Sequence, residues 1–528
     1  MDNGASSYRR FLDGDKNAFD EILDLYRESL IFFINRFVHN LDTAEDLAAD
    51  SFAELLVNPK RFNFSCSLKT YLFTSLRPTP ELSFAIRTLG CDTGVVVTAS
   101  HNPPQYNGYK AYWNDGAQVI EPHDTGIIDE VNAVSTIKTI SKEEALASGK
   151  LIMIDKEVDE KYWEMCKAQL FRPDVIKAKA SEAKIVYTPL HGTGAMHVEK
   201  VLGDLGLNII TVPEQREPDG NFPTVEKPNP EEKPALTLAV ELAKKEKADG
   251  VMATDPDSDR FGTAFPDKDG NFVLLSGNQM GALLIDYILR SRKELGKMPA
   301  NPAIIRSIVT SPFGDYICKK YGVKMIECLT GFKWIAAVEA NFEKDNSASY
   351  VFGLEESYGY KVETEVMDKD GVSAAAMCAE MILYWRSQGK SLLEHLDDLY
   401  KEFGYFEDRA ISQNFPGASG SETMKAMMSS MRANPPKTLG GEKVVKVRDC
   451  LADPELPKSN VLQFYLESGT IVSARPSGTE PKIKFYINSM IPAGDGSDKW
   501  YEDAKKKAAV LCDGIATDIQ KIIDAASK

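Results

Sequence analysis

The sequence lacks an excess of positive charge, a long apolar run and a paired cysteine motif. Its 62 Lys and Arg residues stand against 78 Asp and Glu, for a formal net charge of −16, which argues against general nucleic-acid binding. No apolar run reaches the roughly 18 residues that a membrane-spanning helix needs. The eight cysteines stand singly, without a CxxC pair, so they indicate inert thiols rather than a zinc site or a disulfide framework.

A signal peptide is also lacking at the start, because MDNGASSYRRFLDGD has neither the basic nor the apolar region of one. We therefore expect a cytoplasmic protein that does not bind membranes. With 528 residues, 43% of them hydrophobic, the chain can form roughly three to five domains. An acidic chain that binds an anionic substrate needs a locally basic pocket.

From about residue 85 onward, short β-rich runs alternate with helical patterns, as in repeated α/β units. The clearest unit contains IVYT, the loop PLHGTG, an amphipathic stretch over 195–205 and NIITV. A long helical pattern over 372–403 closes the third unit. The C-terminal part differs, since VLQFYLE, a Ser468-Gly469 turn and TIVSARPSG read as antiparallel strands before a helix that starts near residue 499.

The first 70 residues are almost wholly helical by pattern, with apolar residues at three- and four-residue spacing. The expected fold class is thus α/β, with three α/β domains, a C-terminal α+β domain and a small all-α segment in front. The expected limits are 1–70, 71–180, 181–300, 301–415 and 416–528.

A serine follows the apolar run GVVV, in the segment TASHNPPQYNGYK over 98–110. A serine at the end of a buried strand is well placed to act as a nucleophile, so Ser100 is our candidate. A plain turn is the alternative, because Asn, Pro and Gly favour turns. His101 invites a hydrolase triad, but no GxSxG elbow surrounds it.

Three aspartates alternate in DPDSDR, after the apolar run DGVMAT. Asp255, Asp257 and Asp259 can converge on one hard cation, and three carboxylates suit Mg²⁺. The spacing begins like an EF-hand, but the glycine and glutamate of a calcium loop are absent. A solvated acidic turn is the alternative reading.

Two further loops carry polar groups. The segment GLEESYG over 353–359 offers acceptors for sugar hydroxyls, and RPSGTEP over 475–481 offers a guanidinium, hydroxyls and exposed amides for a phosphate. Each of these loops alone also fits a structural turn or a hairpin. All four loops together supply the positioning and charge neutralisation that phosphoryl transfer requires.

The four loops, in this order, resemble those of the α-D-phosphohexomutase superfamily, from about residue 71 to the C-terminus. The family reads TASHNP, DxDxDR, GEES and RxSGTEP, and this chain has all four motifs, with Leu354 as an extra spacer. The flanking YTPLHGTG, PDGNFPTVEKPNPEE and TGFKWI resemble the bacterial phosphoglucomutase and phosphopentomutase branch. The resemblance implies a magnesium-dependent mutase, with Ser100 as the phosphoserine and its phosphate completing metal coordination by Asp255, Asp257 and Asp259.

The resemblance also implies roles for other residues. Lys110 matches a proton carrier beside the serine, Arg260 a group that neutralises phosphate charge, and Lys333 a residue that steers the sugar phosphate. Glu355 and Ser357 match the residues that hold sugar hydroxyls. The residues that would bind the second phosphate are Arg475, Ser477, Gly478 and Thr479.

The implied reaction interconverts sugar 1-phosphate and sugar 6-phosphate by a ping-pong route through a bisphosphate, with glucose 1,6-bisphosphate as activator. The EE of the sugar loop favours glucose phosphate over mannose phosphate, and mannose or pentose phosphate remain the alternatives. The first α/β domain is expected to be truncated, because the family's N-terminal TSGLRG-like loop is missing.

In its place, residues 7–70 resemble region 2 of extracytoplasmic-function sigma factors. The resemblance is carried by YRRF, GDKNAF, AEDL and TYLF. It implies contacts with RNA polymerase and promoter DNA only if this segment is functional. The alternative from another class is therefore an inactive fusion or a polymerase-binding regulator.

Overall fold

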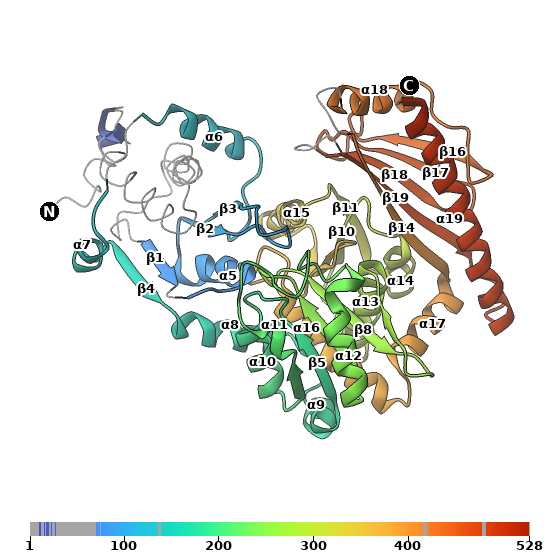
Figure 1. The fold of residues 1–528 in the computed structure, drawn as a ribbon, viewed down its shortest axis with the longest axis horizontal. Coiled ribbons are helices and arrows are strands. Elements are labelled where there is room, and N and C mark those ends of the chain that lie inside the picture. Colours follow the sequence, from blue (N-terminus) through green and yellow to red (C-terminus); the bar gives the residue numbers. More distant parts are fainter. Residues whose placement is uncertain are drawn as a thin grey trace. The chain divides into compact units, whose positions relative to one another are not determined.

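The computed structural model describes residues 10–11, 15, 17–20, 23, 27, 70–73, 75–135, 139–415, 420–477 and 482–526 (Figure 1). The helical segment predicted over 1–70 lies largely outside these residues, and within it 17–20 is helical. The chain divides into two compact units, each described here by itself. The first comprises Met1–Leu170, Ala180–Phe261 and Tyr360–Met377, and the second Phe171–Lys179, Gly262–Gly359 and Cys378–Lys528.

The first unit begins with two small strand pairs and a helix. Strand β1 (Thr70–Phe73) pairs in parallel with β4 (Leu151–Ile154), and β2 (Thr93–Val97) pairs antiparallel with β3 (Tyr109–Trp113). Helix α5 (Thr79–Leu89) has a proline in its first turn and ends at the left-handed Gly90. The other helices of this part are α6 (His123–Ala133), α7 (Lys142–Ala147) and α8 (Lys156–Ala168).

The α/β unit read from IVYT to NIITV is confirmed. Strand β5 (Lys184–Thr188) leads into α10 (Ala195–Asp204), which returns to β6 (Asn208–Thr211). Strand β7 (Gly250–Thr254) and β6 flank β5, and all three strands run parallel. Every residue of β7 is buried, as its unbroken apolar run requires. The remaining elements are η1 (Ala180–Glu182), α11 (Pro213–Arg216), η2 (Lys233–Leu236) and α12 (Thr237–Glu246).

The second unit contains the next parallel sheet. Strand β10 (Pro302–Ser307) lies between β11 (Lys324–Cys328) and β12 (Ser349–Glu355). The other elements are α9 (Pro173–Lys179), β8 (Phe261–Pro266), β9 (Phe272–Leu274), α13 (Gly277–Glu294), α14 (Phe313–Tyr321) and α15 (Phe332–Asp345). Strand β13 (Gly359–Lys361) and helix α16 (Gly371–Ser387) cross the division between the units.

The helical pattern over 372–403 forms two helices rather than one. Helix α16 ends at Ser387, and α17 (Leu392–Phe403) begins five residues later. Gly389 has a φ of 74°, which stops the first helix, and the Ser391 side chain accepts from the Glu394 amide in a capping box that starts the second. The polar run RSQGKS, with its glycine, and the Ser391–Glu394 spacing of a capping box are local signals of this break that the reading of one long helix passed over.

The C-terminal part is the α+β region expected from its sequence. Its sheet has the order β14-β19-β18-β17-β16-β15, and α19 packs on β14 and β19 (Figure 1). Gly469, with a φ of 95°, makes the predicted turn between β17 and β18. The elements are β14 (Gly404–Asn414), α18 (Gly420–Ala433), β15 (Thr438–Leu439), β16 (Glu442–Asp449), β17 (Leu462–Leu466), β18 (Ile471–Pro476), β19 (Lys482–Pro492) and α19 (Asp498–Ala526).

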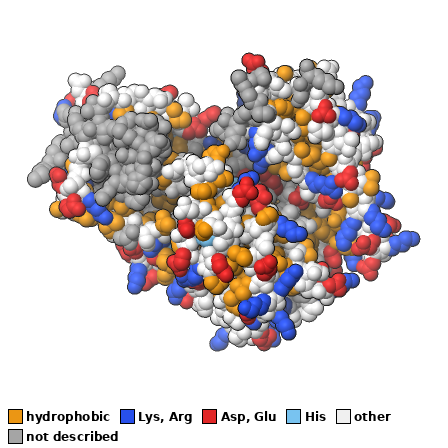
Figure 2. All heavy atoms as spheres, in the orientation of Figure 1, with side chains coloured by type: hydrophobic (Ala, Val, Ile, Leu, Met, Phe, Trp, Pro, Cys, Tyr) orange, Lys and Arg blue, Asp and Glu red, His pale blue; other side chains and the backbone are white. Residues whose placement is uncertain are grey.

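The surface agrees with the composition. On the face in Figure 2, basic and acidic side chains lie intermixed. Among the described residues, no helix combines the length and the apolar character needed to cross a membrane. The seven cysteines of the described part are free, and all but the half-buried Cys91 are buried, as expected for inert thiols.

Candidate active site

The loop that carries Ser100 joins β2 to β3, and its backbone fixes the serine in place. The Thr98 amide donates to the Gly108 carbonyl oxygen at 2.9 Å, which closes the base of the loop. Ser100 has a φ of 53°, uncommon for a residue with a Cβ, and its amide donates to Thr98 Oγ1 at 2.9 Å. The Ser100 hydroxyl donates to Asp255 Oδ2 at 2.9 Å. The predicted nucleophile thus faces the predicted metal loop.

Asp255, Asp257 and Asp259 follow β7, and their carboxylates converge. One oxygen from each lies within 4.8 Å of the others, and all three residues are buried. Ser258 between them is left-handed, with a φ of 57°. Asp257 Oδ1 and Asp259 Oδ1 accept no hydrogen bond from the residues that the structure describes. Buried carboxylate oxygens with free lone pairs are ligands for a hard cation, so these residues fit Mg²⁺.

Burial and neighbouring charge give the three carboxyls different pKa values. Burial, followed by the charges of Asp257 and Asp259, raises the pKa of Asp255 well above its usual value. Burial also acts to raise the pKa of Asp259, but nearby cations outweigh it and hold that pKa far below its usual value. A divalent cation would favour the ionised form of all three groups.

Two half-buried ammonium groups compensate the aspartates. Lys110 Nζ lies 2.7 Å from Asp257 Oδ2 and 3.0 Å from Asp259 Oδ2. Lys369 Nζ lies 2.7 Å from Asp259 Oδ2. Burial acts to lower the pKa of Lys369, but the charges of Asp259 and Asp368 together outweigh it, so the pKa is raised and the ammonium keeps its charge. Lys369 was missed in the sequence, although the charged segment DKDG directly before an apolar helix was a usable signal.

His101 lies beside the nucleophile but does not complete a hydrolase triad. Its Nδ1 is 3.1 Å from Ser100 Oγ and 3.9 Å from Asp255 Oδ2. Because one nitrogen faces both groups, the ring cannot link a carboxylate to the serine through its two nitrogens. Burial, followed by the charge of Arg260, lowers the pKa of His101 to about 3, so the imidazole is neutral.

Arg260 ends the metal loop and is held by a carboxylate. Its Nη1 donates to Glu231 Oε1 at 2.6 Å, and its amide donates to Asp255 Oδ1 at 3.1 Å. Glu231 belongs to the PNPEE segment that carried part of the family resemblance. The guanidinium therefore stays in the metal-loop region, where it adds positive charge.

Three neighbouring segments support the metal loop. The Thr79 amide donates to the Asp257 carbonyl oxygen at 2.9 Å, and Thr79 Oγ1 donates to Asp257 Oδ2 at 3.2 Å. The Thr193 amide donates to the carbonyl oxygen of Pro256 at 2.8 Å. The Gly371 amide donates to the carbonyl oxygen of Ser258 at 3.0 Å. Sequence motifs did not predict these supports, because they join residues that are distant along the chain.

The sugar loop lies in the second unit, at the end of β12. Glu355 is buried, and its Oε1 accepts from the Gly331 amide at 2.6 Å. Glu356 Oε2 accepts from Ser307 Oγ at 3.0 Å and from Thr310 Oγ1 at 3.3 Å. Glu355 thus anchors the TGFKWI segment, while Glu356, which the sequence analysis did not select, ties the loop to the end of β10.

Lys333 and Ser357 retain partial exposure. Lys333 lies in the first turn of α15, two residues after the Gly331 that Glu355 holds. Ser357 follows the two glutamates and precedes Tyr358, whose φ of 65° is left-handed. Within the second unit, these side chains are positioned by a strand end and a helix start, which are frequent places for ligand-binding groups.

The phosphate loop extends β18 in the same unit. Arg475 lies near the end of this strand, where it pairs with Lys484 of β19, and the Ser477 amide donates to the Lys482 carbonyl oxygen at 2.7 Å. Arg475 and Ser477 are partly exposed, as groups that bind a phosphate need to be. Gly478 and Thr479 lie outside the described residues.

A serine set against three buried aspartates, at the ends of strands in repeated α/β units, is the arrangement of a phosphoryl-transfer enzyme. Residues 62–138, 160–270 and 276–403 match the families described as phosphoglucomutase/phosphomannomutase alpha/beta/alpha domains I, II and III. The chain belongs to the phosphoglucomutase/phosphomannomutase family of mutase enzymes. The predicted superfamily and fold class are thereby confirmed.

The similarity extends over most of the chain. The chain is 37% identical over 456 residues to the "Probable phosphomannomutase" of Haemophilus influenzae, and the match covers 85% of this chain and 86% of that one. The chain is also 33% identical over 453 residues to a phosphoglucomutase of Staphylococcus epidermidis, and this match covers 83% of this chain and 80% of that one. The structure of pp63/parafusin, a phosphoglucomutase from Paramecium, matches with a TM-score of 0.64 at 18% identity, covering 87% and 83%. This structural likeness supports the fold alone.

Proposed function

We propose that this chain interconverts sugar 1-phosphate and sugar 6-phosphate through a phosphoserine at Ser100, with glucose phosphate as the preferred substrate. The observation that carries the proposal is the Ser100 hydroxyl, 2.9 Å from Asp255 and beside two more buried aspartates. Relatives named phosphoglucomutase and phosphomannomutase support the reaction class. The GLEES form of the sugar loop favours glucose.

Asp255, Asp257 and Asp259 would hold Mg²⁺, which neutralises phosphate charge when it is bound. Phospho-Ser100 gives its phosphoryl group to a sugar hydroxyl, so the bond from phosphorus to Ser100 Oγ breaks and a bond to the sugar oxygen forms. Lys110 gives a proton to the departing serine oxygen and takes up the proton of the sugar hydroxyl, and Arg260 adds positive charge. The bisphosphate then turns and returns its other phosphate to Ser100, while glucose 1,6-bisphosphate charges the free serine.

The residues of the second unit bind and orient the sugar phosphate. Glu355 and Ser357 hold sugar hydroxyls, and Lys333 steers the phosphate near the helix start. The Gly331 amide donates to Glu355 Oε1 at 2.6 Å, which helps to fix the direction of the carboxylate. The groups that bind the phosphate that is not being transferred are Arg475, Ser477, Gly478 and Thr479.

Intact-mass analysis tests the first half-reaction. The purified chain is incubated with glucose 1,6-bisphosphate and Mg²⁺, beside its Ser100→Ala variant. We expect one added phosphate on the unsubstituted chain and none on the variant. A folded chain that takes up no phosphate would contradict the proposal, since every later step requires phospho-Ser100.

The sugar preference needs a separate assay. Turnover of glucose, mannose and pentose 1-phosphates is compared at equal enzyme concentration, and we expect the highest kcat/KM with glucose 1-phosphate. A higher value with mannose 1-phosphate would assign the chain to the phosphomannomutase alternative.

The polymerase-binding alternative rests on the sigma-like motifs alone. It predicts retention of the chain on immobilised RNA polymerase and no phosphate on Ser100.

A further inference from the structure

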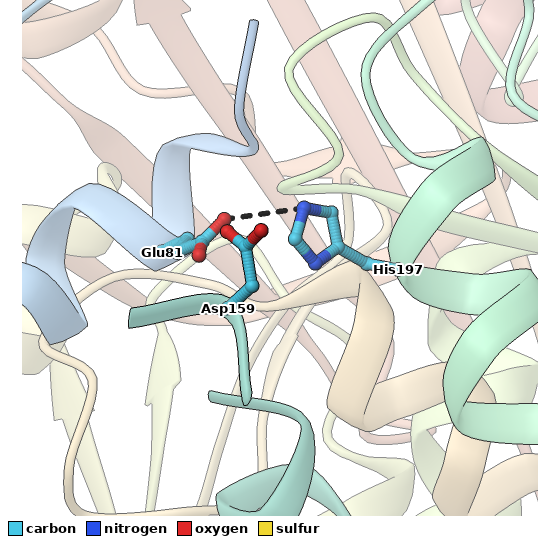
Figure 3. Close-up of side chains that lie close together, drawn as sticks. All are labelled: Glu81, Asp159 and His197. Carbon is cyan, nitrogen blue, oxygen red and sulfur yellow. Dashed lines mark ion pairs between the residues drawn. The ribbon is translucent and has the colours of Figure 1, made fainter. Parts of the chain in front are cut away.

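Three buried polar side chains meet where α5, α8 and α10 of the first unit come together. Glu81 and His197 are fully buried, and Asp159 is 2% exposed. Figure 3 shows the Glu81 and Asp159 carboxyls next to each other, with the His197 ring facing Glu81. None of the three has a part in the proposed reaction. Buried polar groups are costly unless they are paired, so this cluster requires an explanation.

Asp159 is an ionised partner of an arginine. Arg77 Nε donates to Asp159 Oδ1 at 2.7 Å, and Arg77 Nη2 donates to Asp159 Oδ2 at 2.9 Å. Burial acts to raise the pKa of Asp159, but the hydrogen bonds with Arg77 and Glu81 and the charge of Arg77 together outweigh it and lower that pKa. The same guanidinium also donates to Asp155 Oδ1 at 3.2 Å. Its positive charge is thus already matched, and an ionised Glu81 next to it would be in excess.

His197 is a neutral imidazole of defined tautomer. Trp163 Nε1 lies 2.8 Å from His197 Nδ1, and an indole nitrogen can only donate, so Nδ1 carries no proton. The ring proton is therefore on Nε2, which lies 3.1 Å from Glu81 Oε2. Burial lowers the pKa of His197 to about 3, in agreement with the neutral form.

Glu81 lacks the donors that a buried carboxylate needs. Neither of its oxygens accepts a hydrogen bond of good geometry from the described residues. Burial, followed by a hydrogen bond to Asp159, raises the pKa of Glu81 to about 10. A protonated Glu81 donates to the ionised Asp159 and so satisfies both groups with one proton.

A metal ion is the obvious alternative, since one ligand atom from each of the three residues lies within 4.8 Å of the others. Coordination by His197 Nε2 would need a lone pair there, while Nδ1 already uses its own lone pair on Trp163. The ring would have to be an imidazolate. In addition, both oxygens of Asp159 are engaged by Arg77. The geometry therefore points to a proton.

The cluster is connected to the phosphoryl site through two helix starts. Thr79, two residues before Glu81, donates its amide and its hydroxyl to Asp257. Thr193, four residues before His197, donates to the carbonyl oxygen of Pro256. We propose that Glu81 is a positioning residue: as a neutral acid it joins α5 to α8 and α10, and through Thr79 it holds Asp257 in place.

The other charged and titratable groups around Glu81 come from four segments. Arg77 precedes α5 and lies 3.9 Å from Glu81 Oε2, and His197 is on α10. Helix α8 contributes Asp159 and the hydroxyl of Tyr162, which donates to Asp370. Asp370 and Asp159 oppose ionisation of Glu81, and Arg77 only partly offsets them.

The fold therefore retains a proton on Glu81 that the unfolded chain loses at its ordinary pKa. Unfolding then releases this proton, so the contribution to stability is present at low pH and falls as pH rises between the two pKa values. His197 has the opposite sign, but its contribution changes only below about pH 6.5. Between pH 7 and 9, comparison with a variant that does not titrate at position 81 separates Glu81 from other buried carboxyls with a raised pKa, such as Glu363.

The test uses the full chain and the variants Glu81→Gln and Glu81→Ala. Glutamine keeps the shape and the donor of the neutral acid but does not titrate. From pH 7 to 9 we expect the Tm of the unsubstituted chain to fall relative to Glu81→Gln by about 5 °C. Glu81→Ala should lower the Tm at every pH, because it leaves Asp159 and His197 beside a cavity.

Phosphorylation of Ser100 by glucose 1,6-bisphosphate provides the second measurement, and this part rests on the proposed function. As the pH is raised, the phosphorylation rate should fall in the unsubstituted chain and not in Glu81→Gln. In Glu81→Ala the rate should be about tenfold lower than in the unsubstituted chain. If the Tm and the phosphorylation rate changed with pH in the same way in the unsubstituted chain and in Glu81→Gln, the inference would be overturned. Stoichiometric zinc in the purified chain, lost in Glu81→Gln, would also overturn it. If no form takes up phosphate, the proposed function fails, while the Tm comparison still decides the role of Glu81.

Discussion

At the residue scale, charge compensation around Asp259 is the main feature of the phosphoryl site. Its carboxylate is fully buried and lies between two ammonium groups, Lys110 at 3.0 Å and Lys369 at 2.7 Å. A buried ion is stable only with such partners, and the same positive charges can stabilise the charge that develops on a transferring phosphoryl group. Lys369 therefore belongs with the residues expected to act on the phosphate.

Replacing Lys369 with alanine should slow phosphorylation of Ser100 by about 100-fold, because one preorganised charge is removed. Lys369→Arg should retain part of the rate. The measurement is the time course of intact mass with glucose 1,6-bisphosphate. The control is Lys521→Ala, since the Lys521 side chain is 71% exposed and pairs only on the surface. A Lys369→Ala rate within twofold of the unsubstituted chain would exclude this role.

At the element scale, the start of α16 determines the shape of the metal loop. Gly371 donates its amide to the Ser258 carbonyl oxygen at 3.0 Å. A Cβ at this position would lie 2.7 Å from that oxygen and 2.9 Å from the Arg260 carbonyl oxygen. Both distances are too short for carbon and oxygen, and both neighbours are backbone, so the loop itself would have to shift.

Gly371→Ala should therefore reduce the phosphorylation rate by about 100-fold, because small displacements of catalytic groups are costly. The matched control is Gly126→Ala in α6, where a Cβ would meet nothing within 4 Å. Rates come from intact mass, and circular dichroism checks that both variants are folded. Equal rates for the two variants would show that the close approach at Gly371 is unimportant.

At the scale of the whole molecule, the functional groups divide between the two units. The groups proposed for phosphoryl transfer belong to the first unit, and those proposed for the sugar and its second phosphate belong to the second unit. Since the chain carries a net charge of −16, an anionic substrate depends on local cations such as Arg475.

Arg475→Ala should raise KM for glucose 1-phosphate by about 10- to 100-fold, because a charge-assisted hydrogen bond to phosphate is lost. The Tm should change little, since the side chain is partly exposed. Steady-state kinetics measure KM, and thermal unfolding measures the Tm. Arg475→Lys, which keeps the charge, should raise KM less than Arg475→Ala does. An unchanged KM would place phosphate binding elsewhere.

Several features were predictable from the sequence because they depend on neighbouring residues. The buried strand before Asp255, the β5–α10–β6 unit and the antiparallel C-terminal strands follow from local periodicity and turn residues. The break between α16 and α17 was not predicted, although the polar run RSQGKS around Gly389 and the Ser391–Glu394 spacing are local signals of it. Truncation of the first domain and the limits of the domains stay predictions.

By itself, the sequence determined the class of fold and the four loops, because motifs and periodicity are short-range properties of the chain. Only the tertiary structure decided which distant groups share a site. It placed Lys369 against Asp259, 110 positions away, and joined Glu81, Asp159 and His197 in one buried cluster. The physical reason is that burial and pairing set the charge of these groups, and both depend on contacts between segments that are remote in the sequence.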